Sequence, residues 1–268
     1  MIFTVMTYNI ERGFHSRNHL LEEHRLQAAQ RIVQQVKPDL LALTEACYGG
    51  PNFHGIKMDY QQLFDFRYGQ FGSYPVIGPR KSDEGGNCLL SQFPMQGEAI
   101  QLAYKGAVRG KIRLEDKILT VDLVHPSYSV DDKEKISTLR PLISGRQEPY
   151  LLTGDFNTVH PDDKYDWDQL VCDLQSYDPE KTAWIVENWR KAELVSWLLE
   201  QGLHDAFPPE SRQSTVPTPY TYGKKMAGVR MDFTFHSPDL KVLEAYVLKN
   251  EDTEIASDHY PIVVKFEV

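Results

Sequence analysis

The clearest candidate for a chemical site in this sequence is the segment Leu151-Leu152-Thr153-Gly154-Asp155-Phe156-Asn157. An apolar run ends at a glycine and then presents a carboxylate and an amide two residues apart. Because alternate side chains of an extended chain point to the same face, we expect Asp155 and Asn157 to lie side by side. Such a pair is able to polarise a water molecule and to hydrogen-bond a phosphoryl oxygen. A turn that uses glycine, aspartate and asparagine for backbone reasons explains the segment equally well.

Five further segments place polar side chains beside apolar runs. They are Asn9, Thr44-Glu45, Val124-His125, Arg230-Met231-Asp232-Phe233 and Ala256-Ser257-Asp258-His259. Each has a structural explanation, such as a turn cap, a solvated glutamate or a hydrogen-bonded core histidine. All of them lie at or beside the end of an apolar strand-like run, where active sites of sheet proteins gather. This shared position favours one common site, with Glu45 as a candidate ligand for a hard metal ion.

The elements that position these residues begin with a strand, a helix and a second strand. Residues 2–8 are rich in β-branched and aromatic side chains, which is typical of a strand. Residues 20–36 carry apolar side chains at helical spacing and stop at Lys37-Pro38, where a helix ends naturally. The short apolar run 39–44 then predicts a buried strand.

Further along the chain, short strand-like runs follow one another with turn signals between them, which indicates antiparallel pairing. The expected strands are 88–93, 98–103, 106–114, 117–124, 149–153, 230–236, 241–248 and 260–268, and the expected helices are 131–143 and 181–201. Interleaved helices and antiparallel strands predict an α/β protein with two packed sheets flanked by helices. We expect a single domain over residues 1–268, with variable loops and helices over about 160–222.

Composition narrows the function classes. The chain of 268 residues has a formal net charge of −9, which argues against a protein that coats nucleic acid by charge alone. It leaves open an enzyme that meets phosphate through a cation held in an acidic pocket. Three cysteines without CxxC spacing, and a start without signal-peptide character, lead us to expect a reduced, cytoplasmic protein without membrane insertion.

Taken in order, the motifs resemble those of the endonuclease/exonuclease/phosphatase superfamily. The resemblance rests on seven anchors across nearly the whole chain: Tyr8-Asn9-Ile10, Pro38-Asp39-Leu40-Leu41-Ala42-Leu43-Thr44-Glu45, Gly86-Asn87-Cys88-Leu89-Leu90-Ser91, Val124-His125, Gly154-Asp155-Phe156-Asn157, Arg230-Met231-Asp232-Phe233 and Ser257-Asp258-His259. It implies a four-layer α/β/β/α sandwich with the site at one mouth of the two sheets. The usual glutamine before the metal-binding glutamate is Thr44 here. The signature of the 5-phosphatases and the threonine variant of the tyrosyl-DNA phosphodiesterases are absent, which makes those substrates less expected.

The resemblance also implies roles for individual residues. Glu45 would be the main Mg²⁺ ligand, with Mn²⁺ as a substitute, and Asn9 and Asp258 would contact the metal directly or through water. Asp155 would orient or deprotonate the attacking water, Asn157 would hold a phosphate oxygen, and His125 would contact the phosphate. His259, oriented by Asp232, would stabilise phosphoryl charge or transfer a proton.

Several residues outside these motifs are candidates for weaker roles. For substrate binding they are Arg109, Asn87, Tyr220 and Tyr222, the last two in an aromatic–basic segment that precedes Asp232. For Arg109 an exposed strand position, and for the tyrosines simple surface packing, are the competing interpretations. The tryptophans Trp184, Trp189 and Trp197 are expected to be packing residues of the long helix.

Three function hypotheses follow. The first is a metal-dependent phosphodiesterase acting on nucleic acid or on a small or lipid phosphodiester. The second is a phosphomonoesterase acting on a small phosphorylated metabolite or lipid. The third is a catalytically silent binding module on the same fold, which the complete set of candidate residues disfavours. No protein partner is expected.

Overall fold

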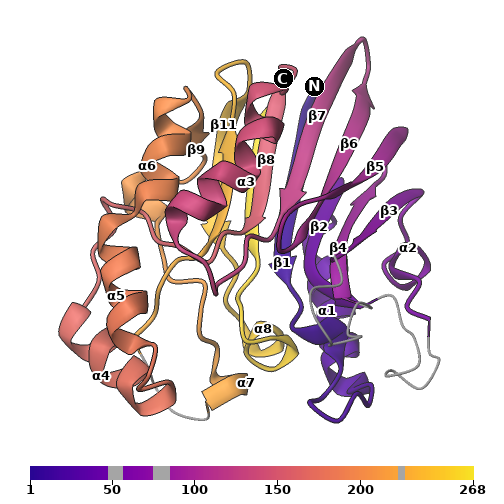
Figure 1. Ribbon diagram of the computed structural model, residues 1–268. Coiled ribbons are helices and arrows are strands. Elements are labelled where there is room, and N and C mark those ends of the chain that lie inside the picture. The colour runs from indigo at the N-terminus through magenta and orange to yellow at the C-terminus, as the bar shows by residue number, and fades with distance from the viewer. Residues whose placement is uncertain (48–56, 75–84, 223–226) are drawn as a thin grey trace.

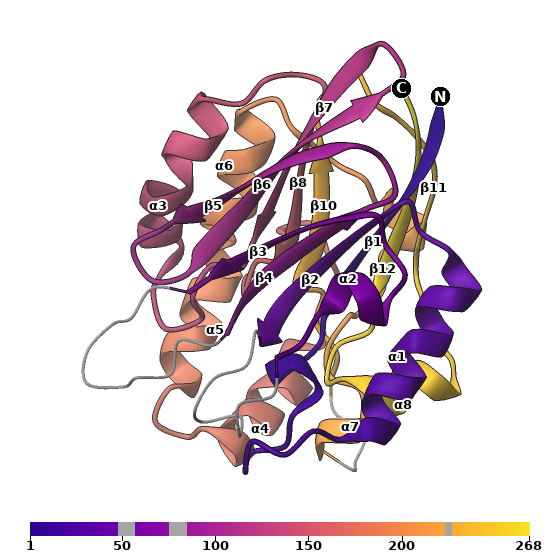
Figure 2. The same ribbon diagram turned by 90° about the vertical axis from the view of Figure 1, so that its right-hand side faces the viewer.

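The computed structural model describes residues 1–47, 57–74, 85–222 and 227–268, without the side chains of Tyr177, Thr221 and Tyr222. Two six-stranded mixed sheets pack face to face, and helices cover their outer faces, as Figures 1 and 2 show. The predicted α/β sandwich of two mainly antiparallel sheets is therefore confirmed. None of the described helices combines the length and apolar composition needed to cross a bilayer.

The first sheet has the strand order β11-β12-β1-β2-β4-β3. Its only parallel pair among the described strands is β1 with β2, and the others pair antiparallel. In chain order its strands are β1 (Ile2–Asn9), β2 (Leu40–Cys47), β3 (Tyr68–Ser73), β4 (Gly85–Ser91), β11 (Lys241–Val247) and β12 (Ile262–Glu267).

The second sheet has the order β5-β6-β7-β8-β10-β9, with β7 and β8 parallel. Its strands are β5 (Met95–Gln101), β6 (Gly106–Leu114), β7 (Lys117–Val124), β8 (Tyr150–Asp155), β9 (His204–Asp205) and β10 (Asp232–His236). The predicted run of antiparallel strands is therefore divided between the sheets, because the chain crosses from one to the other between β4 and β5.

Helices flank both sheets, and a group of short ones lies beyond the strand ends. They are the 3₁₀ turns η1 (Arg12–Phe14) and η3 (Pro209–Ser211), and the helices α1 (Glu23–Val36), α2 (Tyr60–Leu63), α3 (Asp132–Ser144), α4 (Trp167–Tyr177), α5 (Thr182–Lys191), α6 (Glu193–Glu200), α7 (Pro219–Tyr222) and α8 (Glu251–Ala256). Helices α1 and α8 cover the first sheet, and α3 and α6 cover the second (Figure 2).

Alternation along the strands builds three apolar layers. Val5 of β1 faces the layer between the sheets, whereas its neighbour Met6 faces α1 on the outer side. On the second sheet, Leu151 faces inward and Leu152 packs against α3 and α6. Because a strand has a side-chain period of two, a slip of one residue would exchange these layers, and burial on both faces holds the register.

The predicted helix 181–201 is wrong as a single element. Ala192 has a left-handed backbone (φ 47°) and divides it into α5 and α6. The buried carboxylate of Asp132 accepts the backbone N–H of Leu194 at 3.0 Å and thereby satisfies a donor at the start of α6. Apolar periodicity continues across Ala192, so the break depends on a contact with a distant helix.

Candidate active site

The candidate residues gather where strands of both sheets end. Asn9 closes β1, Asp155 closes β8, and His125 follows β7, while Asp232 opens the antiparallel β10. This end of the sandwich opens into a cavity of about 680 Å³. Of the predicted residues, its lining includes Glu45, His125, Asp155, Asn157, Asp258 and His259.

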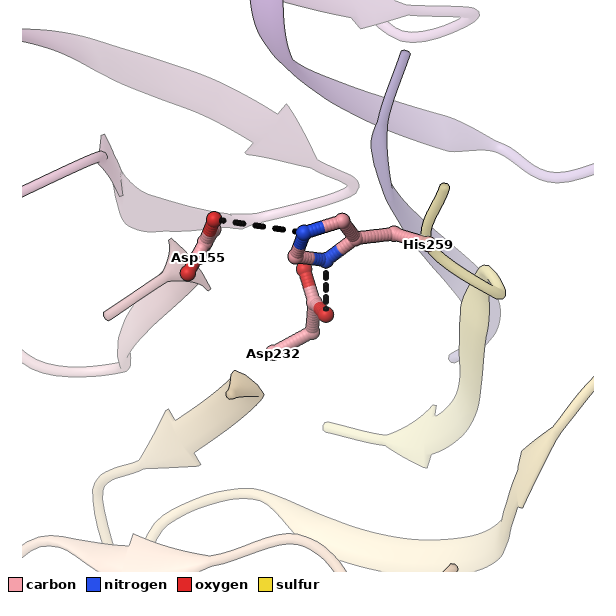
Figure 3. Close-up of side chains that lie close together, drawn as sticks. All are labelled: Asp155, Asp232 and His259. Atoms are coloured by element: carbon pink, nitrogen blue, oxygen red, sulfur yellow. Dashed lines mark hydrogen bonds and ion pairs between the residues drawn. The ribbon is translucent and has the colours of Figure 1, made fainter. Parts of the chain in front are cut away.

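The site contains a buried chain of two carboxylates and one imidazole, which is drawn in Figure 3. His259 Nδ1 lies 2.8 Å from Asp232 Oδ2, and its Nε2 lies 3.8 Å from Asp155 Oδ2. Burial alone would lower the pKa of His259, but the charges of Asp232, Asp258 and Asp155 outweigh it and hold that pKa well above its usual value. Both ring nitrogens of His259 therefore face carboxylates, and this arrangement favours the protonated ring.

Asp155 sits at the centre of the polar contacts. Its Oδ1 accepts the backbone N–H of Asn157 at 2.9 Å, and its Oδ2 accepts the amide of Asn9 at 3.0 Å and lies 3.5 Å from His125 Nε2. Burial, aided by the charge of Asp232, raises the pKa of Asp155 to about 7 despite the opposing charge of His259. A carboxylate with such a pKa is suited to accept a proton near neutral pH.

The backbone around Asp155 has little freedom. Gly154 has φ 146°, and a Cβ there would lie 1.8 Å from the carbonyl oxygen of Val124 on the neighbouring strand. Asn157 has φ 49°, a left-handed conformation that asparagine tolerates better than most residues. Its amide donates to the carbonyl of Pro126 at 3.0 Å, and its own carbonyl accepts from Lys135 at 2.7 Å. The Gly-Asp-Phe-Asn pattern therefore has a backbone reason as well as a chemical one.

Glu45 reaches the cavity through an irregularity in β2. The register with β4 shifts between Leu43 and Ala46, and Glu45 itself has φ 55°. Such bulges re-aim a side chain at the cost of local pairing. Its backbone N–H donates to the hydroxyl of Tyr74 at 3.1 Å, and its carboxylate accepts the backbone N–H of Arg12 at 3.3 Å.

The structure groups carboxylates in a way that fits a divalent cation. Glu45, Asp258 and Glu11 line the same cavity. Burial, and after it the charges of Asp258 and Glu45, raises the pKa of Glu11 to about 7 although Arg25 opposes the shift. The pKa of Asp258 is likewise raised by burial and by Glu45. Oxygen donors that repel one another are the ligands that a hard cation such as Mg²⁺ requires.

A second group of side chains places its possible metal-binding atoms close together. One ligand atom each from Asp155, Asp232 and His259 lie within 4.8 Å of one another. We favour the Glu45–Asp258 side for the metal, because a protonated His259 has no lone pair to offer. Asn9 donates its amide to Asp155 and accepts the N–H of Glu11 at 3.0 Å, so both ends of its side chain already have protein partners.

Three of the weaker substrate-binding candidates, Arg109, Asn87 and Tyr220, are not among the residues that line the cavity. Arg109 binds the buried carboxylate of Asp122 at 2.8 and 2.6 Å and is held inside the second sheet. Asn87 is fully buried and links Gly106 to Tyr74. Tyr220 donates to Glu22 at 2.8 Å and stacks on Arg25. Tyr222 ends α7, and its side chain lies outside the described part of the structure.

The tryptophan prediction is correct only in part. Trp197 is buried against the second sheet, as expected. Trp189 packs against the buried cluster that contains Leu170 and Val229, as expected, and also lines the cavity. Trp184 lines the cavity with 38% of its surface exposed, which differs from the prediction. The break at Ala192 turns α5 away from α6, so these rings face a different part of the molecule from that of Trp197.

Other residues of the site were not anticipated. Tyr74 joins three predicted groups, because its hydroxyl lies 2.8 Å from His125 Nδ1 and also contacts Asn87 and the N–H of Glu45. Lys105 lies over the Tyr74 ring, 4.3 Å from its centre, and lines the cavity with Lys135 and Glu11. In the sequence Lys105 stands out only as part of a turn, so a contact across the sheets was needed to find it.

Comparisons with known proteins agree with the fold described above. Residues 6–259 match the model of the Endonuclease/Exonuclease/phosphatase family. No curated protein matches the sequence. Among solved structures, an endonuclease/exonuclease/phosphatase from Beutenbergia cavernae DSM 12333 has a TM-score of 0.70 at 18% identity, over 100% of this chain and 72% of that one. A family protein from Leptotrichia buccalis C-1013-b has a TM-score of 0.66 at 16% identity, over 99% and 100%. ANGEL2, described as a 2',3'-cyclic phosphatase in complex with adenosine-2',3'-vanadate, has a TM-score of 0.64 at 15% identity, over 99% and 95%.

Proposed function

The chain belongs to the endonuclease/exonuclease/phosphatase family, and on this premise we propose that it is a divalent-metal-dependent phosphodiesterase that hydrolyses its substrate by in-line attack of water. One observation carries the proposal. Asp155 and His259, the latter paired with Asp232, line the same cavity as the carboxylates of Glu45 and Asp258. A binding module without catalytic activity is not expected to retain a buried imidazolium between two carboxylates, because burying these charges costs desolvation free energy.

In the proposed reaction a water oxygen attacks phosphorus while the bond from phosphorus to the leaving oxygen breaks. Asp155 accepts the proton of the water, for which its raised pKa of about 7 suits it. His259 donates a hydrogen bond from Nε2 to a non-bridging phosphoryl oxygen, and Asp232 keeps the ring oriented and charged. The Asn157 amide and His125 contact the other phosphoryl oxygens.

Glu45 and Asp258 are the residues proposed to hold the metal. Asn9, whose side chain bonds Asp155 and Glu11, is proposed to contact the metal through water. When bound there, Mg²⁺ would neutralise charge on the phosphoryl group and on the leaving oxygen, and Mn²⁺ is the expected substitute. The role of Glu11 would be to complete the carboxylate set from the neighbouring turn, where it also pairs with Arg25 at 3.2 Å.

A phosphodiester is the proposed substrate, with nucleic acid and small or lipid diesters as the candidate classes. Phosphomonoester hydrolysis by the same residues is the alternative, because the site provides for attack on phosphorus whichever ester it carries. A cytoplasmic location is part of the proposal. We also propose that residues 1–268 act as a single domain.

The proposal is tested with bis(p-nitrophenyl) phosphate and p-nitrophenyl phosphate, in Mg²⁺ and in EDTA. We expect diester cleavage that EDTA abolishes and that His259→Ala reduces by at least about a hundredfold. His204→Ala is the matched control, because His204 is an exposed histidine of the edge strand β9. Cleavage of the monoester alone would favour the phosphatase alternative. Cleavage of neither ester, with no effect of Mg²⁺ on the melting temperature, would favour the silent module.

A further inference from the structure

The cavity has a second wall that the proposed reaction does not use. Segments far apart in sequence form it: the α4–α5 hairpin, and residues 216–217 and 227–231. Figure 1 shows α4 and α5 beside the lower ends of the strands. The apolar side chains of this wall are Leu170, Leu174, Trp184, Ile185, Trp189, Val216, Pro217, Ala227, Val229 and Met231.

This wall is built as a small core of its own. Val159, Leu170, Ala192 and Val229 are buried together, and Trp189 packs against them. Trp184 and Ile185 line the cavity beside this cluster, and 38% of Trp184 is exposed. Apolar surface exposed in this way gains free energy when a ligand removes it from water.

The apolar wall begins directly beside the residues proposed to act on phosphorus. Met231 precedes Asp232, and its carbonyl accepts the N–H of Phe156, the neighbour of Asp155, at 2.8 Å. On the other side Thr218, which follows Pro217, donates its N–H to the carbonyl of Asp258 at 2.9 Å. A group attached to a phosphoryl unit in the site is therefore within reach of the wall.

On the described part of this wall the charges are mainly acidic, and the other cations of the cavity, Arg12, Arg17, Lys105 and Lys135, belong to other segments. Among the described lining residues of the wall segments, Asp173 and Asp178 stand against a single cation, Lys181. Lys181 lies 3.8 Å from Asp178, so its charge is already compensated. Proteins that follow a nucleic-acid strand place arginine and lysine along the flanking phosphates. A carboxylate-bearing apolar wall instead fits a substrate with one phosphoryl group and an uncharged organic group.

We propose that this wall is a specificity subsite for the apolar organic group of the substrate, and that the substrate is a small phosphodiester carrying an alkyl or aryl group rather than a polynucleotide. The inference rests on the proposed phosphoesterase site, which would hold the phosphoryl end. The cavity volume of about 680 Å³ is in the range that encloses a small organic ligand.

The test uses methylphosphonate, hexylphosphonate and phenylphosphonate, whose C–P bonds an esterase does not cleave. Their dissociation constants are measured by calorimetry with Mg²⁺ present, so the readout is binding and not turnover. We expect the hexyl and phenyl compounds to bind at least about tenfold more tightly than the methyl compound, because each fully buried methylene contributes roughly fourfold. A tighter hexyl compound would identify an alkyl chain as the occupant, and a tighter phenyl compound a planar ring.

Two variants locate the effect. Trp184→Ala and Ile185→Asn change partly exposed residues, so each is expected to fold, and each should remove most of the preference while leaving methylphosphonate binding unchanged. Ile118→Ala is the control, since Ile118 is 46% exposed on β7 and does not line the cavity. Equal affinity for all three phosphonates, or a preference that survives both variants, overturns the inference.

The outcomes separate this inference from the proposed function. Diester hydrolysis without any preference among the phosphonates would retain the phosphodiesterase and reject the apolar subsite. A preference that depends on Trp184, in a protein that hydrolyses no ester, would retain the subsite and reject the enzyme. An oligonucleotide cleaved more efficiently than methyl p-nitrophenyl phosphate would also overturn the inference.

Discussion

Asp232 offers a direct test of how the site controls its imidazolium. In Asp232→Asn the carboxylate becomes a neutral amide of the same shape. Asp232 Oδ1 has no hydrogen-bond partner within the described part of the chain, whereas Oδ2 lies 2.8 Å from His259 Nδ1. The amide nitrogen can therefore take the place of Oδ1, and the oxygen can still accept from the ring. The substitution removes charge and largely preserves geometry.

The expected magnitude follows from this contact. A buried hydrogen bond to a charged group contributes about 1.5–3 kcal/mol. If that contribution is made mainly in the transition state, the loss of kcat is about 10- to 150-fold. Removing the charge also lowers the pKa of His259, since Asp232 is the largest of the charges that raise it.

The sign of the stability effect is set by the same pKa. Because the folded-state pKa of His259 lies above its usual value of 6.5, its contribution to stability is complete below pH 6.5 and is lost as pH rises through the folded pKa. The destabilisation caused by Asp232→Asn should accordingly be largest at low pH and diminish at high pH.

Three measurements check this reasoning. They are kcat on bis(p-nitrophenyl) phosphate, an NMR titration of the His259 ring in EDTA, and urea unfolding at several pH values. The double variant Asp232→Asn/His259→Ala should be no less active than His259→Ala alone, because the two residues act as a unit. A kcat within threefold of wild type in Asp232→Asn, while His259→Ala is inactive, would refute the assigned role. An unchanged ring pKa would refute the electrostatic argument.

Three other predictions concern stability and metal binding. The pKa of Asp155 is about 7 in the folded state against 3.8 ordinarily, so its contribution to stability is lost as pH rises from 3.8 through 7. In EDTA, Asp155→Asn should therefore increase the free energy of unfolding more at pH 8 than at pH 5, by on the order of 2 kcal/mol. An equal change at both pH values would contradict this. Gly154→Ala should destabilise by about 3 kcal/mol or more in urea unfolding because its Cβ would meet the Val124 carbonyl, whereas Gly202→Ala, with φ 79° and open space around it, should cost only about 1–2 kcal/mol. Mg²⁺ at a hundredfold excess over Kd should stabilise the protein by about 3 kcal/mol. Glu45→Gln should abolish this stabilisation, whereas the control Glu98→Gln on β5 should preserve it. Stabilisation that survives in Glu45→Gln would place the metal elsewhere.

Most strands and the residues at their ends were accessible from the sequence, whereas β3 and β9 were not predicted. A buried strand leaves a local record, because its apolar run is continuous or alternating and a turn signal closes it. Glu45, Asp155 and His259 were therefore identified in the right elements, and the structure brings them to one cavity. The alternative interpretation of this segment, a backbone reason for its glycine, also holds in the structure, because Gly154 has φ 146° and lies close to the carbonyl of Val124.

Other features depended on contacts between distant segments. The bulge that re-aims Glu45 arises from pairing with β4, and the break at Ala192 is held by Asp132 on another helix. The same break turns Trp184 toward the cavity, although its helical spacing is that of a packing residue.

There is a physical reason why some features were predictable from the sequence and others were not. Strand and helix periodicities report which residues are buried, because burial repeats along each element with its own period. They do not report which segment lies opposite, since apolar contacts are non-directional and many partners satisfy them. The sequence by itself determined which residues form the proposed phosphoryl-binding end of the site, because they belong to local motifs. Only the tertiary structure decided that the α4–α5 hairpin forms the opposite wall, because that wall is made by packing between segments with no motif in common.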